Sequence, residues 1–277
     1  MKRVASVPAR INIIGEHTDH FGGLSLAFSS QHRLVLTASS RDDGIRGEET
    51  IVRLWKAAGG WNAELSVVSD IPIGAGLSSS AALCVAIIMC SQNPRNRMEI
   101  ATKAQRIEHE ILGSACGLLD QIAITHSKRG NAALINFKEM AVENFRLPDG
   151  WVFKLVDTGI RRSLSETEYV EPNTNEETRK NHSERESLRV REALSCDATQ
   201  LGELLNHSHS SISEKILTST PEVDLIVRKV QNISGVLGAR LMGGGFGGMI
   251  LALLEDENAL PGETLISSDS AFLQETI

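Results

Sequence analysis

The sequence is poor in aromatic residues, cysteines and long apolar runs, and each shortage excludes a class of protein. Aromatic residues are only 4% of the 277, so we expect a core of Leu, Ile, Val and Ala. The four cysteines form no Cys-x-x-Cys pair and no zinc-binding spacing, which indicates reduced thiols in a cytosolic protein. No run of about eighteen apolar residues occurs, so no membrane-spanning helix is predicted.

The chain also lacks a basic surface pattern and a secretory leader. Its formal net charge is −7, and no basic stretch is interleaved with aromatic residues, so we expect no nucleic-acid binding. Residues 1–8 contain no apolar h-region, so no signal peptide is predicted. These absences predict a cytoplasmic protein that binds neither nucleic acid nor membrane. The length of 277 residues allows one large domain or two small ones, and we expect a monomer or homodimer.

What the sequence does contain is a glycine- and serine-rich stretch, residues 72–82, between an expected strand and an expected helix. Residues 63–69 alternate apolar and polar side chains, and residues 81–90 are a continuous apolar run. Glycine allows a close backbone approach, and serine caps a helix through its hydroxyl group. Free N–H groups and the helix dipole then favour an anion, so this stretch predicts a phosphate site.

Two familiar phosphate loops do not fit the stretch. A Walker A loop ends in Gly-Lys-Ser/Thr, and no lysine is present here. A Rossmann fingerprint needs a third glycine where this chain has Ser79. From the residues alone, a helix cap without any ligand remains the alternative.

A second concentration of polar groups follows the apolar run at residues 11–14. Arg10, Glu16, His17 and Asp19 lie within ten residues of one another at a strand end. Carboxylates accept hydrogen bonds from sugar hydroxyls and arginine neutralises developing charge, so the cluster suits a polyol site. The alternatives are a metal site, for which His-Glu-x-x-His spacing is absent, and a solvated loop.

Further elements are expected along the rest of the chain. Gly243–Gly248 holds five glycines in six residues, which indicates a close backbone approach. Asp120, after two leucines, would by itself more often be a helix N-cap. The patterns predict strands at 3–7, 11–14, 24–38, 51–55, 61–68 and 249–254, and strand material at 145–156 with a turn at residues 148–150. They predict helices at 95–112, 187–194, 198–213 and 221–234. We expect a hairpin at Gly59-Gly60 and a charged loop or helix entry at 171–187, whereas residues 255–277 are uninformative.

Three of these stretches resemble one family. Residues 72–82 resemble the central motif of the GHMP kinases, Pro-x-x-x-Gly-Leu-Ser/Gly-Ser-Ser-Ala. Residues 10–19 resemble the signature of its galactokinase branch, Gly-Arg-x-Asn-Leu-Ile-Gly-Glu-His-x-Asp-Tyr, with Ala9 in place of the first glycine and His20-Phe21 in place of Tyr-Asn. Residues 238–248 resemble the third GHMP motif, Gly-Ala/Ser-Arg-Met-Thr-Gly-Gly-Gly-Phe-Gly-Gly.

The resemblance implies a fold and a reaction. The fold would be α/β (α+β), with a ribosomal-protein-S5-like N-terminal domain at 1–148 and a ferredoxin-like C-terminal domain at 149–277. The reaction would be phosphoryl transfer from MgATP to the anomeric hydroxyl of galactose, giving galactose 1-phosphate and ADP, with ATP and Mg²⁺ as cofactors.

The resemblance also assigns roles to residues of this sequence. Asp120 would be the catalytic base, and Arg10 would stabilise the alkoxide. The sugar would be bound by Glu16, His17, Asp19, Gly117 and Tyr169; ATP by Gly74, Gly76, Leu77, Ser78, Ser79, Ser80, Ala81, Gly244 and Gly245; and Mg²⁺ by Ser80 and Glu108.

Other functions remain open within the same resemblance. The substrate could be arabinose, galacturonate or an N-acetylhexosamine, or the chain could be a non-catalytic galactose/ATP sensor. The loop Ser78–Ala82 is whole, and both Arg10 and Asp120 are present, which favours an enzyme over a sensor.

Overall fold

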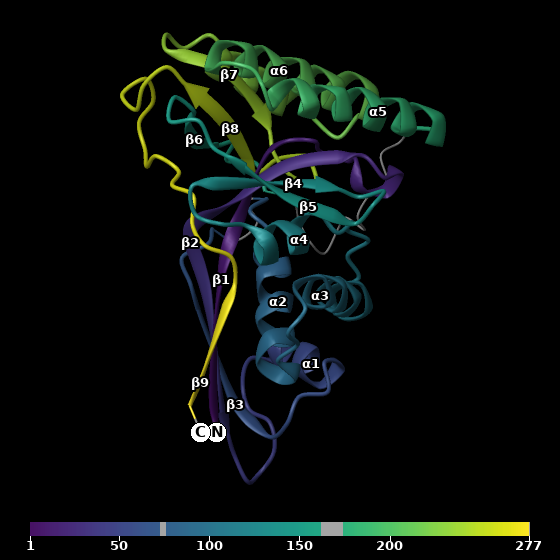
Figure 1. Ribbon diagram of the computed structural model, residues 1–277, viewed down its shortest axis with the longest axis vertical. Helices are drawn as coiled ribbons and strands as arrows, with labels where there is room; N and C mark the ends of the chain where they lie inside the picture. Colours follow the sequence, from purple (N-terminus) through teal and green to yellow (C-terminus); the bar gives the residue numbers. More distant parts are fainter. Residues whose placement is uncertain (73–75, 162–173, 277) are drawn as a thin grey trace.

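The structure is a computed structural model that describes residues 1–72, 76–161 and 174–276 (Figure 1). It is a mixed α/β protein, as predicted. Its strands are β1 (Lys2–Ile14), β2 (Leu24–Ser40), β3 (Ala63–Ser69), β4 (Asn131–Asn136), β5 (Ala141–Arg146), β6 (Val152–Asp157), β7 (Val236–Leu241), β8 (Met249–Leu254) and β9 (Phe272–Thr276). Its helices are α1 (Glu49–Ala57), α2 (Ser79–Gln92), α3 (Arg97–Leu112), α4 (Leu119–His126), α5 (Glu176–Ala193), α6 (Ala198–Ser211) and α7 (Pro221–Gln231), with short turns η1 (Asp19–Phe21) and η2 (Ile212–Ile216).

The larger sheet has the strand order β5-β4-β2-β1-β9, and β3 pairs with the far half of β2. Helices α1, α2 and α3 lie together on one side of it (Figure 1). Helix α2 is apolar on nearly every side and buries residues from Ala81 to Ser91, because it lies between the sheet and α3. This packing fixes the start of α2 at the upper end of β1, where the polar motifs meet.

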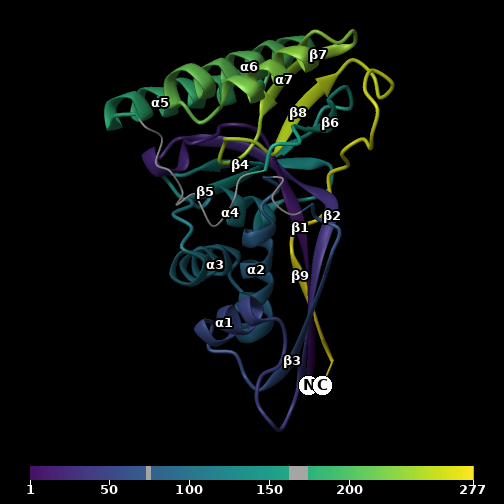
Figure 2. The ribbon, with the colours of Figure 1, turned by 180° about the vertical axis from the view of Figure 1, so that it is seen from behind.

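The smaller sheet has the order β6-β8-β7 and packs against α6 and α7. Every residue of β8 is buried, which agrees with its uninterrupted apolar sequence. The helices α5, α6 and α7 lie together at the end of the molecule opposite the chain termini (Figure 2). None of the helices in the described part of the chain has the length and apolar character of a membrane span.

The last strand returns to the first sheet. Strand β9 pairs antiparallel with β1, placing Phe272 opposite Ser6, so the two chain ends lie side by side (Figures 1 and 2). The sequence of residues 255–277 carried no signal for this pairing. A domain boundary at 148/149 stays a prediction; the smaller sheet lies within residues 152–254.

Several sequence predictions are confirmed, and the strand at 51–55 with its hairpin is wrong. The strand at 249–254 has the predicted bounds, and β3 covers the alternating run at 63–69. Helix α3 ends at Leu112 as predicted, and Gly113 follows it with a φ of 68°. Residues 51–55, predicted to be a strand, belong to α1, so no hairpin forms at Gly59-Gly60. The Glu48 carboxylate caps the first turn, and Ile51, Leu54 and Trp55 share one buried face at helical spacing.

The contact between α6 and β7 depends on two glycines and yields a stability prediction. A Cβ added at Gly238 would lie 2.1 Å from the Gly202 carbonyl oxygen. Gly238→Ala should therefore lower the free energy of unfolding by about 1–3 kcal/mol or more, as overpacking does. Gly150→Ala is the matched control, because a Cβ there meets no atom within 4 Å. Urea unfolding of both variants checks this, and equal stability would contradict the packing described.

Candidate active site

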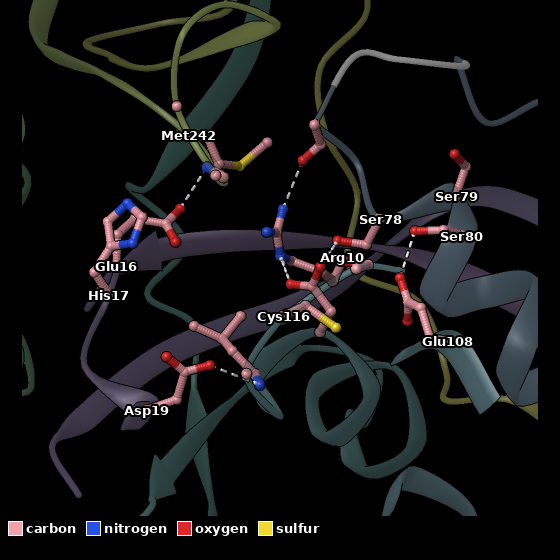
Figure 3. Close-up of a pocket in the computed structure, with 18 of the residues that line it drawn as sticks. Arg10, Glu16, His17, Asp19, Ser78, Ser79, Ser80, Glu108, Cys116 and Met242 are labelled. Atoms are coloured by element: carbon pink, nitrogen blue, oxygen red, sulfur yellow. Dashed lines mark hydrogen bonds and ion pairs between the residues drawn. The ribbon is translucent and has the colours of Figure 1, made fainter. Parts of the chain in front are cut away.

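The polar motifs converge on one cavity of about 250 Å³ (Figure 3). Its walls come from β1 and the loop after it, the start of α2, α3, the start of α4 and the glycine run after β7. The residues lining it are Arg10, Glu16, His17, Asp19, Gly76, Ser78, Ser79, Ser80, Glu108, Ser114, Cys116, Gly117, Leu119, Asp120, Met242, Gly243, Gly244, Gly245 and Gly247.

Arg10 and Asp120 form an ion pair at the centre of this cavity. The Arg10 side chain is 4% exposed, and its Nε donates to Asp120 Oδ1 at 2.6 Å. Its Nη1 donates to the Gly76 carbonyl at 2.8 Å, which ties β1 to the glycine- and serine-rich loop before α2. Burial alone would lower the pKa of Arg10, but Asp120, Glu16 and Asp19 outweigh it and raise that pKa above its ordinary value. The guanidinium is thus a permanent positive charge.

Asp120 is not the N-cap that its local sequence favoured. The N-cap of α4 is Leu118, and Asp120 lies one residue inside the helix, in its first turn. Its carboxylate accepts hydrogen bonds from Arg10 and from Ser78. The side chain is therefore held by two other parts of the chain, and the capping interpretation is wrong.

The start of α2 also lacks the side-chain cap that its serines predicted. Ser78 is the N-cap residue but has a left-handed backbone, with φ 61°, and its side chain makes no capping hydrogen bond. Ser79 and Ser80, in the first helical turn, line the cavity, as does Gly76. Leu77 and Ala81 are each 1% exposed and pack into the core. Gly74 lies outside the described residues.

Ser80 and Glu108 form a pair of oxygen-bearing side chains at the start of α2. Ser80 Oγ donates to Glu108 Oε1 at 2.7 Å, and Gln121 Nε2 donates to Oε2 at 2.7 Å. Burial raises the pKa of Glu108, which is 2% exposed. The described residues hold no group of three or more metal-ligating side chains. Mg²⁺ needs only one or two protein oxygens when phosphates and water complete its shell, so this pair fits the ion.

Glu16 is engaged on the other side of the cavity. Its Oε1 accepts from the backbone N–H of Gly243 at 2.7 Å and from Arg240 Nη2 at 3.3 Å. Arg240 is fully buried and also donates to the carbonyl groups of Asn12 and Ile13. Burial would raise the pKa of Glu16, but Arg240 and Arg10 outweigh it and lower that pKa. The pair joins the first motif to the glycine run.

His17 and Asp19 lie between β1 and β2, and Gly117, in the connection between α3 and α4, packs against Asp19. His17 has φ 56°, and its Nε2 lies 3.5 Å from Thr218 Oγ1. Burial lowers the pKa of His17 to about 4, so the imidazole is neutral at pH 7. Asp19 Oδ2 accepts from Leu119 N at 3.4 Å, and burial raises the pKa of Asp19. A Cβ at Gly117 would lie 1.7 Å from Asp19 Oδ2, so only glycine leaves room for this carboxylate.

The glycine run packs against the rest of the site, as its composition predicted. Gly243 and Gly245 have φ of 88° and 95°. A Cβ at Gly245 would lie 2.2 Å from the Thr218 carbonyl oxygen, and Phe246 N donates to that oxygen at 2.7 Å. Gly244 and Gly245 line the cavity at the predicted place.

Some residues of the site escaped sequence reasoning. The cavity is also lined by Ser114, Cys116, Leu119, Met242, Gly243 and Gly247, which the motif roles did not include. Helix α5 begins at Glu176 within the stretch expected to be a charged loop or helix entry, and buries His182 and Glu186 against the loop after β1. The six cavity residues could have been found only from their position next to the motifs. His182 and Glu186 could have been found only from helical spacing among the charged residues of α5. Tyr169 lies outside the described residues.

Family comparisons agree with the convergence of motifs. The model described as the GHMP kinases N terminal domain matches residues 48–128, and that described as GHMP kinases C terminal matches residues 190–261. The galactokinase galactose-binding signature matches residues 2–40. Each of the three matched segments contributes residues to the cavity walls.

Individual relatives resemble most of the chain. A galactokinase of Chloroflexus aggregans is 29% identical over 92% of this chain and 84% of its own length. The structure of Lactococcus lactis galactokinase complexed with galactose has a TM-score of 0.82 at 24% identity, covering 98% of this chain and 95% of that one. Mevalonate kinase of Methanococcus jannaschii has a TM-score of 0.70 at 18% identity, covering 92% and 91%. With two domain models of one family contributing walls to a single cavity, and the fold shared with solved members, the chain belongs to the GHMP kinases.

Proposed function

We propose that this chain is an ATP-dependent sugar kinase that converts galactose and MgATP into galactose 1-phosphate and ADP. One observation carries the proposal. Arg10, Glu16, His17 and Asp19 lie within the segment that matches the galactose-binding signature, and they line the same cavity as Ser80, Glu108 and Asp120. The cavity thus offers groups for a polyol and for a nucleotide within reach of one ion pair.

The loop after β1 would bind the sugar. A carboxylate such as that of Asp19 accepts hydrogen bonds from hydroxyl groups, and a neutral His17 has one donor and one acceptor nitrogen. Glu16 has one oxygen committed to Gly243 and Arg240, so it serves mainly to fix the loop. The Gly117 backbone would let the sugar approach Asp19 closely.

Asp120 and Arg10 would carry the chemistry. Asp120 accepts the proton of the anomeric hydroxyl group. The anomeric oxygen of the sugar bonds to the γ-phosphorus of ATP, and the bond between that phosphorus and the bridging oxygen of ADP breaks. Arg10 stays protonated and stabilises the negative charge near the reacting oxygen. The N–H groups at the start of α2 and in the glycine run hold phosphate oxygens. Mg²⁺ held by Ser80 and Glu108 would neutralise phosphate charge.

The charge of the cavity favours a neutral sugar. Among the described residues that line it are four carboxylates, Glu16, Asp19, Glu108 and Asp120, against one guanidinium, Arg10. His17 adds no positive charge at pH 7, because its pKa is about 4. A sugar acid would bring a further negative charge next to Asp19, which costs binding energy.

The first prediction concerns the sugar. Galactose should exceed glucose, 2-deoxygalactose and galacturonate in kcat/KM, by up to about 10⁴-fold where a hydroxyl partner is missing or misplaced. The reason is that the polar groups of the site are left unpaired by the wrong hydroxyl pattern. An ATP-consumption assay over a panel that includes arabinose and N-acetylgalactosamine measures this. Equal turnover of glucose would contradict the proposed substrate.

The second prediction separates chemistry from folding at Asp120. Asp120→Asn should lower kcat by ~10²–10⁴-fold, because an amide cannot accept the proton. Asp149→Asn, at an exposed position in the turn before β6, is the control and should keep wild-type kcat. Steady-state kinetics and a melting curve are recorded on the same samples. A kcat within about threefold of wild type, well below the usual general-base effect and measured at a temperature where the melting curve shows the variant to be folded, refutes Asp120 as the base.

The third prediction follows from the lowered pKa of His17. The folded-state pKa of about 4 lies below the ordinary 6.5, so the unfolded chain binds the proton more tightly. His17 therefore destabilises the fold progressively as pH falls from about 6.5 through 4, and has no such effect at pH 7 and above. His17→Asn should lose less stability than wild type between pH 7 and 4.5 in urea titrations. Identical pH dependence in both proteins would show that His17 is not held neutral.

A further inference from the structure

Ser78 occupies an unusual position at the start of α2. A serine at a helix N-cap ordinarily has an extended backbone and accepts a hydrogen bond from the first helical turn. Ser78 instead has φ 61° and ψ 38°, a left-handed conformation that side chains rarely adopt, and its hydroxyl caps nothing. It is only 9% exposed. The hydroxyl group of Ser78 therefore has a role other than capping the helix.

The hydroxyl group of Ser78 is directed at Asp120. It donates to Asp120 Oδ2, while Arg10 Nε donates to Oδ1 at 2.6 Å. Arg10 Nη1 also donates to the Gly76 carbonyl, two residues before Ser78. The carboxylate is thus held between β1 and the phosphate loop, with one contact on each oxygen.

This arrangement conflicts with a role for Ser78 as a phosphate ligand. A hydroxyl has a single O–H to donate, and that hydrogen is committed to Asp120. A phosphate oxygen needs a donor, and Ser79 and the backbone N–H groups of the first turn supply donors in the cavity wall, whereas the Ser80 hydroxyl group donates to Glu108. Each carboxylate oxygen retains a second lone-pair direction, so the two contacts leave Asp120 able to accept a proton.

We propose that Ser78 is a positioning residue for Asp120 rather than a ligand of ATP. Its hydroxyl group fixes the carboxylate rotation that points a free lone pair at the sugar hydroxyl. Since Ser78 begins the helix whose first turn faces the phosphates, it also links the orientation of the base to the nucleotide loop. The inference rests on the proposed function in which Asp120 is the base.

Ser78→Gly tests the proposal without straining the backbone, because glycine adopts φ 61° freely. The expected kcat is about 10- to 100-fold lower, the scale of a misplaced catalytic group. The dissociation constant of a non-hydrolysable ATP analogue, measured by calorimetry with Mg²⁺, should stay within about twofold of wild type. Ser78→Ala, which keeps the Cβ, should match Ser78→Gly in kcat. Weakened nucleotide binding with unchanged kcat would overturn the proposal.

Asn93→Gly is the matched control. Asn93 ends the same helix with a left-handed backbone, φ 50°, and is exposed and away from the cavity. The Asn93→Gly substitution removes a side chain from a left-handed backbone position at the other end of α2. It should leave kcat and nucleotide affinity at wild-type values. A loss of kcat in Asn93→Gly equal to that in Ser78→Gly would show that the helix ends, and not the hydroxyl, set the rate.

A double-mutant cycle decides whether Ser78 acts through Asp120. In an Asp120→Asn background, Ser78→Gly should lower kcat no further. In the ligand-free protein the two substitutions should also be non-additive in urea unfolding. Additive losses in either measurement would overturn the proposal. The unfolding cycle needs no substrate, so a chain that phosphorylates no sugar would refute the proposed function while the Ser78–Asp120 contact is still measured.

Discussion

The site depends on the buried ion pair between Arg10 and Asp120. Arg10 is 4% exposed, and a charge so far from water is tolerated only with a partner at hydrogen-bonding distance. That partner comes from the first turn of α4, and the Gly76 carbonyl takes the remaining contact. Breaking the pair would leave the buried Arg10 charge without its partner, so β1, α4 and the loop before α2 hold one arrangement. The proposed reaction depends on this ion pair, because it fixes the positions of the two residues proposed to carry the chemistry.

A second ion pair gives the cavity its opposite wall. Glu16 and Arg240 are 224 residues apart in sequence, yet they join the loop after β1 to the glycine run that follows β7. Gly243 reaches Glu16 with a left-handed backbone, φ 88°, and a Cβ at Gly245 would collide with the Thr218 carbonyl oxygen. The groups proposed to bind the sugar and those proposed to bind the phosphates thereby line one cavity, which suits a reaction governed by positioning and charge stabilisation.

The sequence predicted the residues of the site better than their contacts. Arg10, Ser80, Glu108 and Asp120 could be found because motif positions carry their identity. The Ser78 contact could not, since it depends on a left-handed backbone that the letters do not reveal. Residues 51–55 were ambiguous because a short mixed run fits both periods, and a cap from Glu48 decides for helix. Strand β9 escaped because its pairing partner lies at the other end of the chain.

The central claim is that this cavity transfers phosphate to the anomeric oxygen of a neutral hexose. The most direct measurement is ³¹P NMR of the purified chain with ATP, Mg²⁺ and galactose. The account predicts one new phosphomonoester resonance, coupled to the anomeric proton, that grows in step with ADP. Phosphate on any other hydroxyl, or ADP formation that does not depend on the sugar, would contradict it.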